Sequence, residues 1–158
     1  LQQMRFGQRI KYMCDVDNSS LDELVPAFVL QPLIENAIIH GLSSSSKGGL
    51  IYVRCFKKED KMWLSVADTG IGIERDKLKN IRRYIDNIFL SPDTKPAATA
   101  ENDNKSDADN GIKRKTVGVG IGNIAYRIKG MYNNSGIKIY SVKDRGTVIQ
   151  IFFDNYSK

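Results

Sequence analysis

The sequence contains no long apolar run. Its hydrophobic stretches are much shorter than the roughly 20 residues that cross a bilayer, so no transmembrane helix is expected. The first residues, Leu1 to Arg5, lack the apolar core of a secretory signal peptide. They also lack an initiator Met, which indicates a piece of a longer protein.

Cysteine and histidine are scarce. Cys14 and Cys55 stand far apart in alternating apolar runs, and neither has a second ligand at metal-binding spacing. We therefore expect buried free thiols in a reducing compartment rather than a disulfide or a metal pair. His40 is the single histidine.

The charge balance is basic, with a formal charge of +6 and a pI near 9.3. This surplus permits a polyanionic partner. The basic residues are scattered except for Lys113-Arg114-Lys115, and a stacking aromatic series is missing, so no nucleic-acid partner is expected. A nucleotide's phosphates would account for a few of the basic residues.

The 158 residues, 41% of them hydrophobic, suit one domain with a real core. Alternation predicts strands at 9–17, 50–57, 61–67, 136–142 and 146–153. Helical spacing predicts helices at 26–42, 74–90 and 123–133, the first regular from near Gln31 because Pro32 breaks a helix interior. This order predicts an α/β fold: a two-layer sandwich with a mixed, mostly antiparallel sheet of about five strands packed on three helices.

Residues 91–117 differ from the rest of the chain. Up to Lys115 they are rich in Pro, Ala, Thr, Asn and Asp, with Ile112 as the one sizeable apolar side chain. Such a segment cannot bury enough surface to fold alone, and a structureless insertion of this length is typically a lid or disordered.

Three polar clusters stand in sequence order. Glu35-Asn36 and His40 lie on the predicted helix 26–42, Asp68-Thr69-Gly70-Ile71-Gly72-Ile73 joins a strand to a helix, and Gly118-Val119-Gly120-Ile121-Gly122-Asn123 precedes another helix. An acid, a hydroxyl and two glycines at a strand end suit a loop that holds something small and polar. A plain turn is the alternative.

Together these clusters resemble the motifs of the ATP-binding domain shared by sensor histidine kinases, type II topoisomerases, Hsp90 and MutL (the GHKL superfamily, with the Bergerat fold). Glu35 to His40 match the N box, the two glycine runs match its glycine boxes, and Gly146-Thr147 matches a further motif. The sequence from Leu30 to Gly41, together with Arg5-Phe6-Gly7 and Val25-Pro26, resembles the LytS-like branch of bacterial sensor histidine kinases. Four motifs in order are specific, whereas one glycine loop is not.

The resemblance implies that Asp68 reads adenine. A carboxylate only accepts hydrogen bonds, which suits the exocyclic amine of adenine, whereas the oxygen of guanine would oppose it; ATP is therefore expected over GTP. Gly70, Gly72 and Ile73 belong to the same ATP-binding loop, and Thr147 assists through its hydroxyl or a bridging water. The alternative for Asp68 is a turn or helix-capping acid.

The phosphate end is assigned to the other two motifs. Asn36 resembles the Mg²⁺ ligand, since Mg²⁺ needs few protein ligands when phosphates supply oxygen; a satisfied buried Asn is the alternative. Backbone N–H groups at a helix start favour phosphate. His40 fits either a phosphate-side donor or a helix-end cap. The remaining assignments to ATP are Gly118, Gly120, Gly122, Asn123 and Arg127, of which Arg127 equally fits a solvated helix charge.

One departure concerns the reaction. Other superfamily members carry Glu or Asn four residues before the magnesium Asn, where this chain has Pro32. Glu35 is the acid nearest to Asn36 in the sequence. Glu35 and His40 are the candidate catalytic residues. Hydrolysis needs a positioned base, whereas a neutral imidazole already has a lone pair, so the pattern favours transfer to histidine over hydrolysis.

The resemblance also implies a context. Residues 1–7 are expected to end an upstream dimerisation helix that carries the acceptor histidine, and 8–158 to form the catalytic domain. The fragment should then bind Mg-ATP without phosphorylating itself. The expected full-length protein is a homodimer that works with a response regulator and is anchored in the inner membrane, with this domain cytoplasmic. An anti-sigma-factor-like serine kinase and a non-catalytic nucleotide-binding module are the alternatives.

Overall fold

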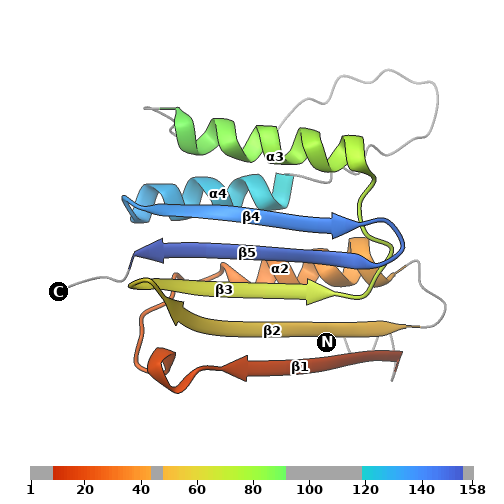
Figure 1. Ribbon diagram of the computed structural model, residues 1–158, viewed down its shortest axis with the longest axis horizontal. Coiled ribbons are helices and arrows are strands. Elements are labelled where there is room, and N and C mark those ends of the chain that lie inside the picture. Colours follow the sequence, from red (N-terminus) through yellow and green to blue (C-terminus); the bar gives the residue numbers. More distant parts are fainter. Residues whose placement is uncertain (1–8, 44–47, 92–118, 155–158) are drawn as a thin grey trace, which may run out of the picture.

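The computed structural model describes residues 9–43, 48–91 and 119–154 (Figure 1). The predicted tail at 1–7, Gly118 and the lid beyond Ser91 lie outside these residues. Among the described helices, none is long and apolar enough to cross a membrane. The strands are β1 (Ile10–Val16), β2 (Gly49–Lys58), β3 (Lys61–Asp68), β4 (Ser135–Val142) and β5 (Gly146–Asp154), and the helices are η2 (Asn18–Ser20), α2 (Leu30–Asn36), η3 (Ala37–Leu42), α3 (Arg75–Leu90) and α4 (Val119–Met131).

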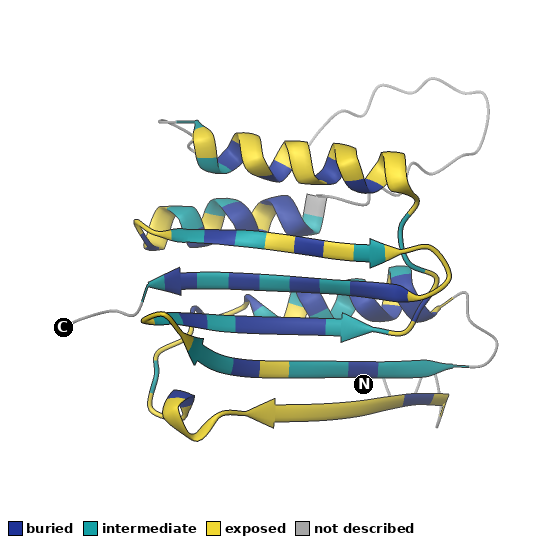
Figure 2. Ribbon diagram, in the orientation of Figure 1, coloured by how far each residue is buried: buried dark blue, intermediate teal, exposed yellow. Residues whose placement is uncertain are grey.

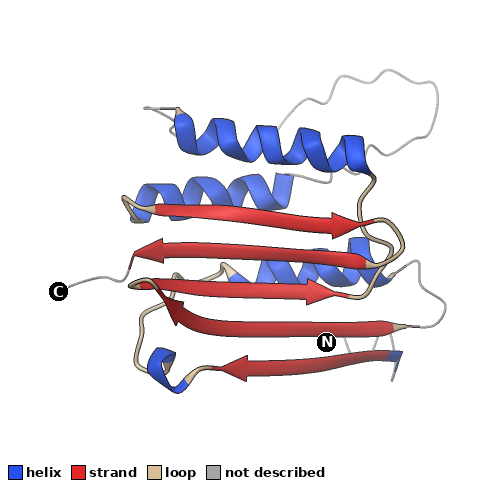
Figure 3. Cartoon of the chain, viewed as in Figure 1, coloured by secondary structure: helices blue, strands red, loops and turns tan. Residues whose placement is uncertain are grey.

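The strands form one five-stranded sheet in the order β1-β2-β3-β5-β4. β1 pairs with β2 in parallel, and the other three pairings are antiparallel. The helices α2, α3 and α4 form a second layer on one face of the sheet (Figures 1 and 3). The predicted two-layer α/β sandwich with a mixed, mostly antiparallel sheet is confirmed.

The core lies between the two layers. The inward stripe of α3 consists of Leu78, Ile81, Ile85 and Ile88, all buried at the predicted helical spacing. Figure 2 shows this stripe as regularly spaced buried positions on a helix whose other face is exposed. The helix contacts α4 and β4, and on the strands β2, β3 and β5 the residues Ile51, Met62, Leu64, Val66, Ile149 and Ile151 are buried.

Regular helix begins at Leu30, which places Pro32 in the first turn of α2. Proline is tolerated there because the first N–H groups of a helix have no partner inside the helix. The helix then loosens into the π-helical segment η3, where the Ser43 N–H reaches back five residues to the Ile38 carbonyl at 2.8 Å. Such π-helical turns are frequent at functional sites.

The prediction that Cys14 of β1 is buried is wrong. Ile10 is buried, but the other six residues of β1, Cys14 among them, are exposed. The reason is that β1 is an edge strand, and Figure 1 shows it beyond the reach of the helical layer. Cys55, on the interior strand β2, is buried, and both cysteines are free.

The second glycine run is less of a loop than expected. α4 begins at Val119 rather than near Asn123, so that Gly120 and Gly122 lie in its first turn. The early start follows from packing, because the buried Ile121 continues the apolar stripe of Ile124 and Ile128. Gly122 is also tightly packed, since a Cβ there would lie 2.7 Å from the Tyr84 hydroxyl.

Candidate functional site

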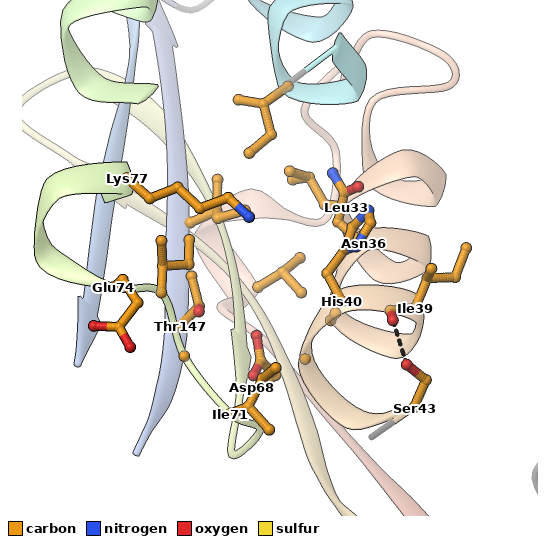
Figure 4. A pocket seen from close by; sticks show the side chains of 17 residues that line it. Leu33, Asn36, Ile39, His40, Ser43, Asp68, Ile71, Glu74, Lys77 and Thr147 are labelled. Carbon is orange, nitrogen blue, oxygen red and sulfur yellow. Dashed lines mark hydrogen bonds between the residues drawn. The ribbon is translucent and has the colours of Figure 1, made fainter. Parts of the chain in front are cut away.

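A cavity of about 360 Å³ opens between the helical layer and one end of β3 and β5 (Figure 4). Its walls come from α2 and η3 on one side and from the loop after β3 with the start of α3 on the other. Side chains of β3, β5 and α4 form its floor. The predicted site residues that line it are Asn36, His40, Asp68, Gly72, Ile73 and Thr147.

Asp68 is the last residue of β3 and pairs with Thr147 on β5. Its Oδ1 accepts a hydrogen bond of 2.8 Å from the backbone N–H of Gly70. The carboxylate lies against Gly41 of η3, where a Cβ would be 2.6 Å from Oδ1. The N-box helix must therefore carry glycine at this turn for the carboxylate to keep its place.

Burial raises the pKa of Asp68 above its ordinary value of 3.8, because the charged form loses water. The backbone N–H groups of Gly70 and Thr147 lower the pKa by donating to the carboxylate, but their effect is smaller than that of burial. Asp68 is thus a half-buried hydrogen-bond acceptor whose carboxylate has lost part of its hydration. A ligand that donates a hydrogen bond would offset that loss.

The loop after Asp68 is fixed by backbone contacts on both sides. The Ile71 N–H donates to the Gly41 carbonyl at 3.0 Å, and the Ile71 carbonyl accepts from the Asp144 N–H at 2.8 Å. Gly72 has a φ of 65°, and a Cβ there would lie 2.1 Å from the Val142 carbonyl oxygen. The loop is therefore held between η3 and the β4–β5 hairpin.

Thr147 is held by Ser141 of β4. The two hydroxyls lie 2.9 Å apart, and the Ser141 Oγ also accepts a 2.9 Å hydrogen bond from the Ile73 N–H. One serine thus connects the wall of the loop with the strand on which Thr147 lies. Thr147 itself is buried beside Asp68, within reach of a group bound at the carboxylate.

Asn36 lines the cavity at the end remote from Asp68 (Figure 4). Its Nδ2 is sealed from solvent and has no hydrogen-bond partner among the described residues. A Cβ on Gly120 would lie 3.5 Å from both Nδ2 and Oδ1, so the amide faces the first turn of α4. A buried amide nitrogen without a partner, on a residue that lines a cavity, fits a ligand position, and rotation of the amide would present its oxygen to a cation.

The structure separates the two candidate catalytic residues. His40 lines the cavity. Glu35 is half-buried, is not among the lining residues, and accepts a 2.9 Å hydrogen bond from the Gln31 side chain. The role predicted for each stays a prediction.

Asn123 and Arg127 do not line the Asp68 cavity. They border a second cavity of about 340 Å³ together with Phe28, Gln31, Pro32, Gly120 and Ile124. The Arg127 guanidinium donates to the Ala27 carbonyl at 3.1 Å, which ties α4 to the segment before α2. Gly120, which borders the second cavity, lies close to Asn36, which borders the first.

Two residues of the site were not singled out from the sequence. Gly41 follows His40 directly, and a glycine inside a helical run is a signal for close approach of another group, because it is otherwise unfavourable there. Lys77 lines the cavity from the first turn of α3. In the sequence it looks like any solvent-facing lysine of an amphipathic helix.

The fold and the cavity together define a nucleotide-binding domain of the ATPase type. The model of the family described as "Histidine kinase-, DNA gyrase B-, and HSP90-like ATPase" matches residues 22–157, and the chain belongs to this family. Membership implies ATP as the ligand of the domain. The resemblance drawn from the four motifs is confirmed.

The relatives narrow the class. The chain is 33% identical over 105 residues to the sensor protein LytS of Staphylococcus haemolyticus, an alignment that covers 66% of this chain but 17% of that protein. The chain thus spans a small part of the curated relatives that it matches. They support the histidine-kinase prediction and give no support to the serine-kinase alternative.

Solved structures confirm the fold. The catalytic domain of the histidine kinase ThkA superposes with a TM-score of 0.55 at 16% identity, covering 97% of this chain and 84% of that one. The histidine kinase domain of the E. coli osmosensor EnvZ gives 0.52 at 14% identity, covering 96% and 79%. At such low identity the likeness concerns the fold.

Proposed function

We propose that this chain is the ATP-binding catalytic domain of a sensor histidine kinase and that it delivers the γ-phosphoryl group of ATP to a histidine on another segment of the full-length protein. The observation that carries the proposal is the cavity itself. It joins a half-buried, acceptor-only carboxylate at one end to an amide nitrogen without a partner at the other, among the residues that the structure describes.

Adenine is assigned to the Asp68 end. The amine of adenine donates to the carboxylate, and Thr147 supplies a neighbouring hydroxyl. The walls here include the apolar Ile71 and Ile73, which suit the faces of a base. Guanine would place an oxygen against the carboxylate and leave both acceptors without a donor, a mismatch of about 1–3 kcal/mol.

The phosphates are assigned to the Asn36 end. Mg²⁺ would be held by the Asn36 oxygen together with phosphate oxygens and water, and it would neutralise charge on the phosphates. Gly120 lies close to Asn36 and borders the second cavity, whose lining includes the donor groups of Asn123 and Arg127. A triphosphate that passes Asn36 would therefore point its end toward that cavity, from which an acceptor side chain would approach.

Calorimetry with Mg-ATP tests the site. The wild-type chain is expected to bind Mg-ATP more tightly than Mg-GTP, and Asp68→Ala is expected to abolish the heat of ATP binding because the base loses its acceptor. Equal heats for the two proteins would show that Asp68 does not lie in the nucleotide site.

Labelled ATP tests the reaction. With γ-labelled Mg-ATP the isolated chain is expected to hydrolyse ATP slowly and to acquire no label, because Glu35 lies outside the cavity and His40 lies in its wall, poorly placed for in-line attack. Label should appear only when a segment carrying the acceptor histidine is added. Rapid hydrolysis without an acceptor would contradict the assignment of histidine as the acceptor.

The full-length context follows from the same class. We infer a homodimer in which residues 1–7 continue an upstream dimerisation helix, residues 8–158 form the catalytic domain, and the 91–117 region acts as a lid. A response regulator would receive the phosphoryl group. Relatives that are sensor proteins favour a membrane-anchored full-length protein with this domain on the cytoplasmic side.

A further inference from the structure

The cavity wall contains one cationic side chain to which none of the sequence motifs assigns a role. Among the described residues that line it, Lys77 is the only lysine or arginine. Arg127, the cation expected from the sequence, faces the second cavity instead. A bound triphosphate carries several negative charges, so the position of a cation in this wall matters for how tightly it binds.

Lys77 extends into the cavity rather than along the helix surface. Figure 4 shows its side chain reaching from the α3 side across the cavity toward Asn36 and His40. Among the described residues its amino group makes no hydrogen bond or ion pair. The neighbouring acid Glu74, which also lines the cavity, is paired with Lys143 of the β4–β5 turn.

We propose that Lys77 binds a phosphate oxygen of the nucleotide, and that it makes the site prefer ATP over adenosine. This inference rests on the proposed function, because it takes the base to lie at Asp68. With the base there, the phosphates run toward Asn36, which is the end of the cavity where the Lys77 amino group lies. Lys77 then faces the phosphates from the wall opposite the N box.

Two variants on the same helix separate this role from a general charge effect. Lys79 is also exposed on α3, but it does not line the cavity, because two residues turn a helix by about 200°. Lys77→Gln and Lys79→Gln remove the same charge from the same helix. Lys77→Arg keeps the charge and tests whether a cation suffices.

Binding of Mg-ATP and of adenosine is measured by calorimetry for all four proteins. Lys77→Gln is expected to weaken Mg-ATP roughly tenfold, the effect of one charge-assisted contact, and to leave adenosine unchanged. Lys79→Gln is expected to change neither ligand, and Lys77→Arg to retain most of the ATP affinity. Added salt should weaken ATP binding to the wild type more than to Lys77→Gln.

Two results would overturn the inference: equal ATP affinity for Lys77→Gln and Lys79→Gln, or an equal loss of ATP and adenosine in Lys77→Gln, which would indicate damage to the cavity. Failure of the proposed function would give different results: either the wild type would bind neither Mg-ATP nor adenosine, or Asp68→Ala would bind both as the wild type does. A wild type that binds neither ligand would also overturn the role of Lys77.

Discussion

Replacing Asp68 by Asn is expected to weaken Mg-ATP binding roughly 10- to 100-fold and, at neutral pH, to make the fold more stable. Binding weakens because the amide of Asn has an NH₂ group where the carboxylate has only acceptors. This NH₂ donor would then face the amine of adenine, which is also a donor. Stability rises because the amide carries no charge and so removes the cost of burying a carboxylate.

The stabilisation should depend on pH with a definite sign. Burial raises the pKa of Asp68 in the folded chain above its ordinary 3.8, so the folded state holds this proton more tightly than the unfolded state does. The contribution of Asp68 to stability is therefore most favourable below pH 3.8 and declines as the pH rises through the raised folded pKa. The advantage of Asp68→Asn should appear over that same interval and vanish in acid.

Thermal unfolding of both proteins from acid, near the ordinary pKa of 3.8, to neutral pH measures this. Asp86→Asn is the matched control, because Asp86 is exposed on the outer side of α3 and its replacement removes the same charge. A wild type more stable than Asp68→Asn at neutral pH would mean that the hydrogen bonds from Gly70 and Thr147 outweigh the burial of the charge. Weaker binding and higher stability in Asp68→Asn together would show that Asp68 serves ligand binding at a cost to the stability of the fold.

The elements that pattern alone predicted are those whose burial is periodic. The helix at 74–90 was predicted from its apolar spacing, and Leu78, Ile81, Ile85 and Ile88 are buried at that spacing. β1 failed the same reasoning, since alternation indicates an extended chain but does not reveal whether another layer covers it. Cys14 was misplaced for this reason, whereas Cys55 on an interior strand was not.

The candidate site was predicted in part for a similar reason. Asp68 and Asn36 belong to motifs in which the residue types themselves indicate the chemistry. Lys77 and the closeness of Gly41 to Asp68 depend on how α3 and η3 are placed on the sheet, and local patterns contain no such distances. The shift of Asn123 and Arg127 to a second cavity likewise follows from the early start of α4 and from its contact with Ala27.

Replacing Gly70 by Ala is expected to cost about 3 kcal/mol of stability, at the upper end for overpacking, and to abolish ATP binding. A Cβ at Gly70 would lie 2.1 Å from the Gly41 carbonyl oxygen, and that obstacle is backbone, which cannot rotate away. Relief requires the loop and η3 to separate, which would break the hydrogen bond from the Ile71 N–H to the Gly41 carbonyl. Asp68 would lose its Gly70 donor in the same movement.

Gly130→Ala is the matched control. Gly130 lies exposed near the end of α4, and a Cβ added there would meet no described atom within 4 Å. The added methyl group therefore enters open space, and alanine should favour the helix by up to about 1 kcal/mol. Chemical denaturation and Mg-ATP calorimetry on both variants provide the comparison. A Gly70→Ala chain that unfolds like the wild type and still binds Mg-ATP would show that the N-box helix and the first glycine loop can move apart freely. Loss of both properties in Gly70→Ala alone would show that this backbone contact couples the phosphate side of the site to its adenine side.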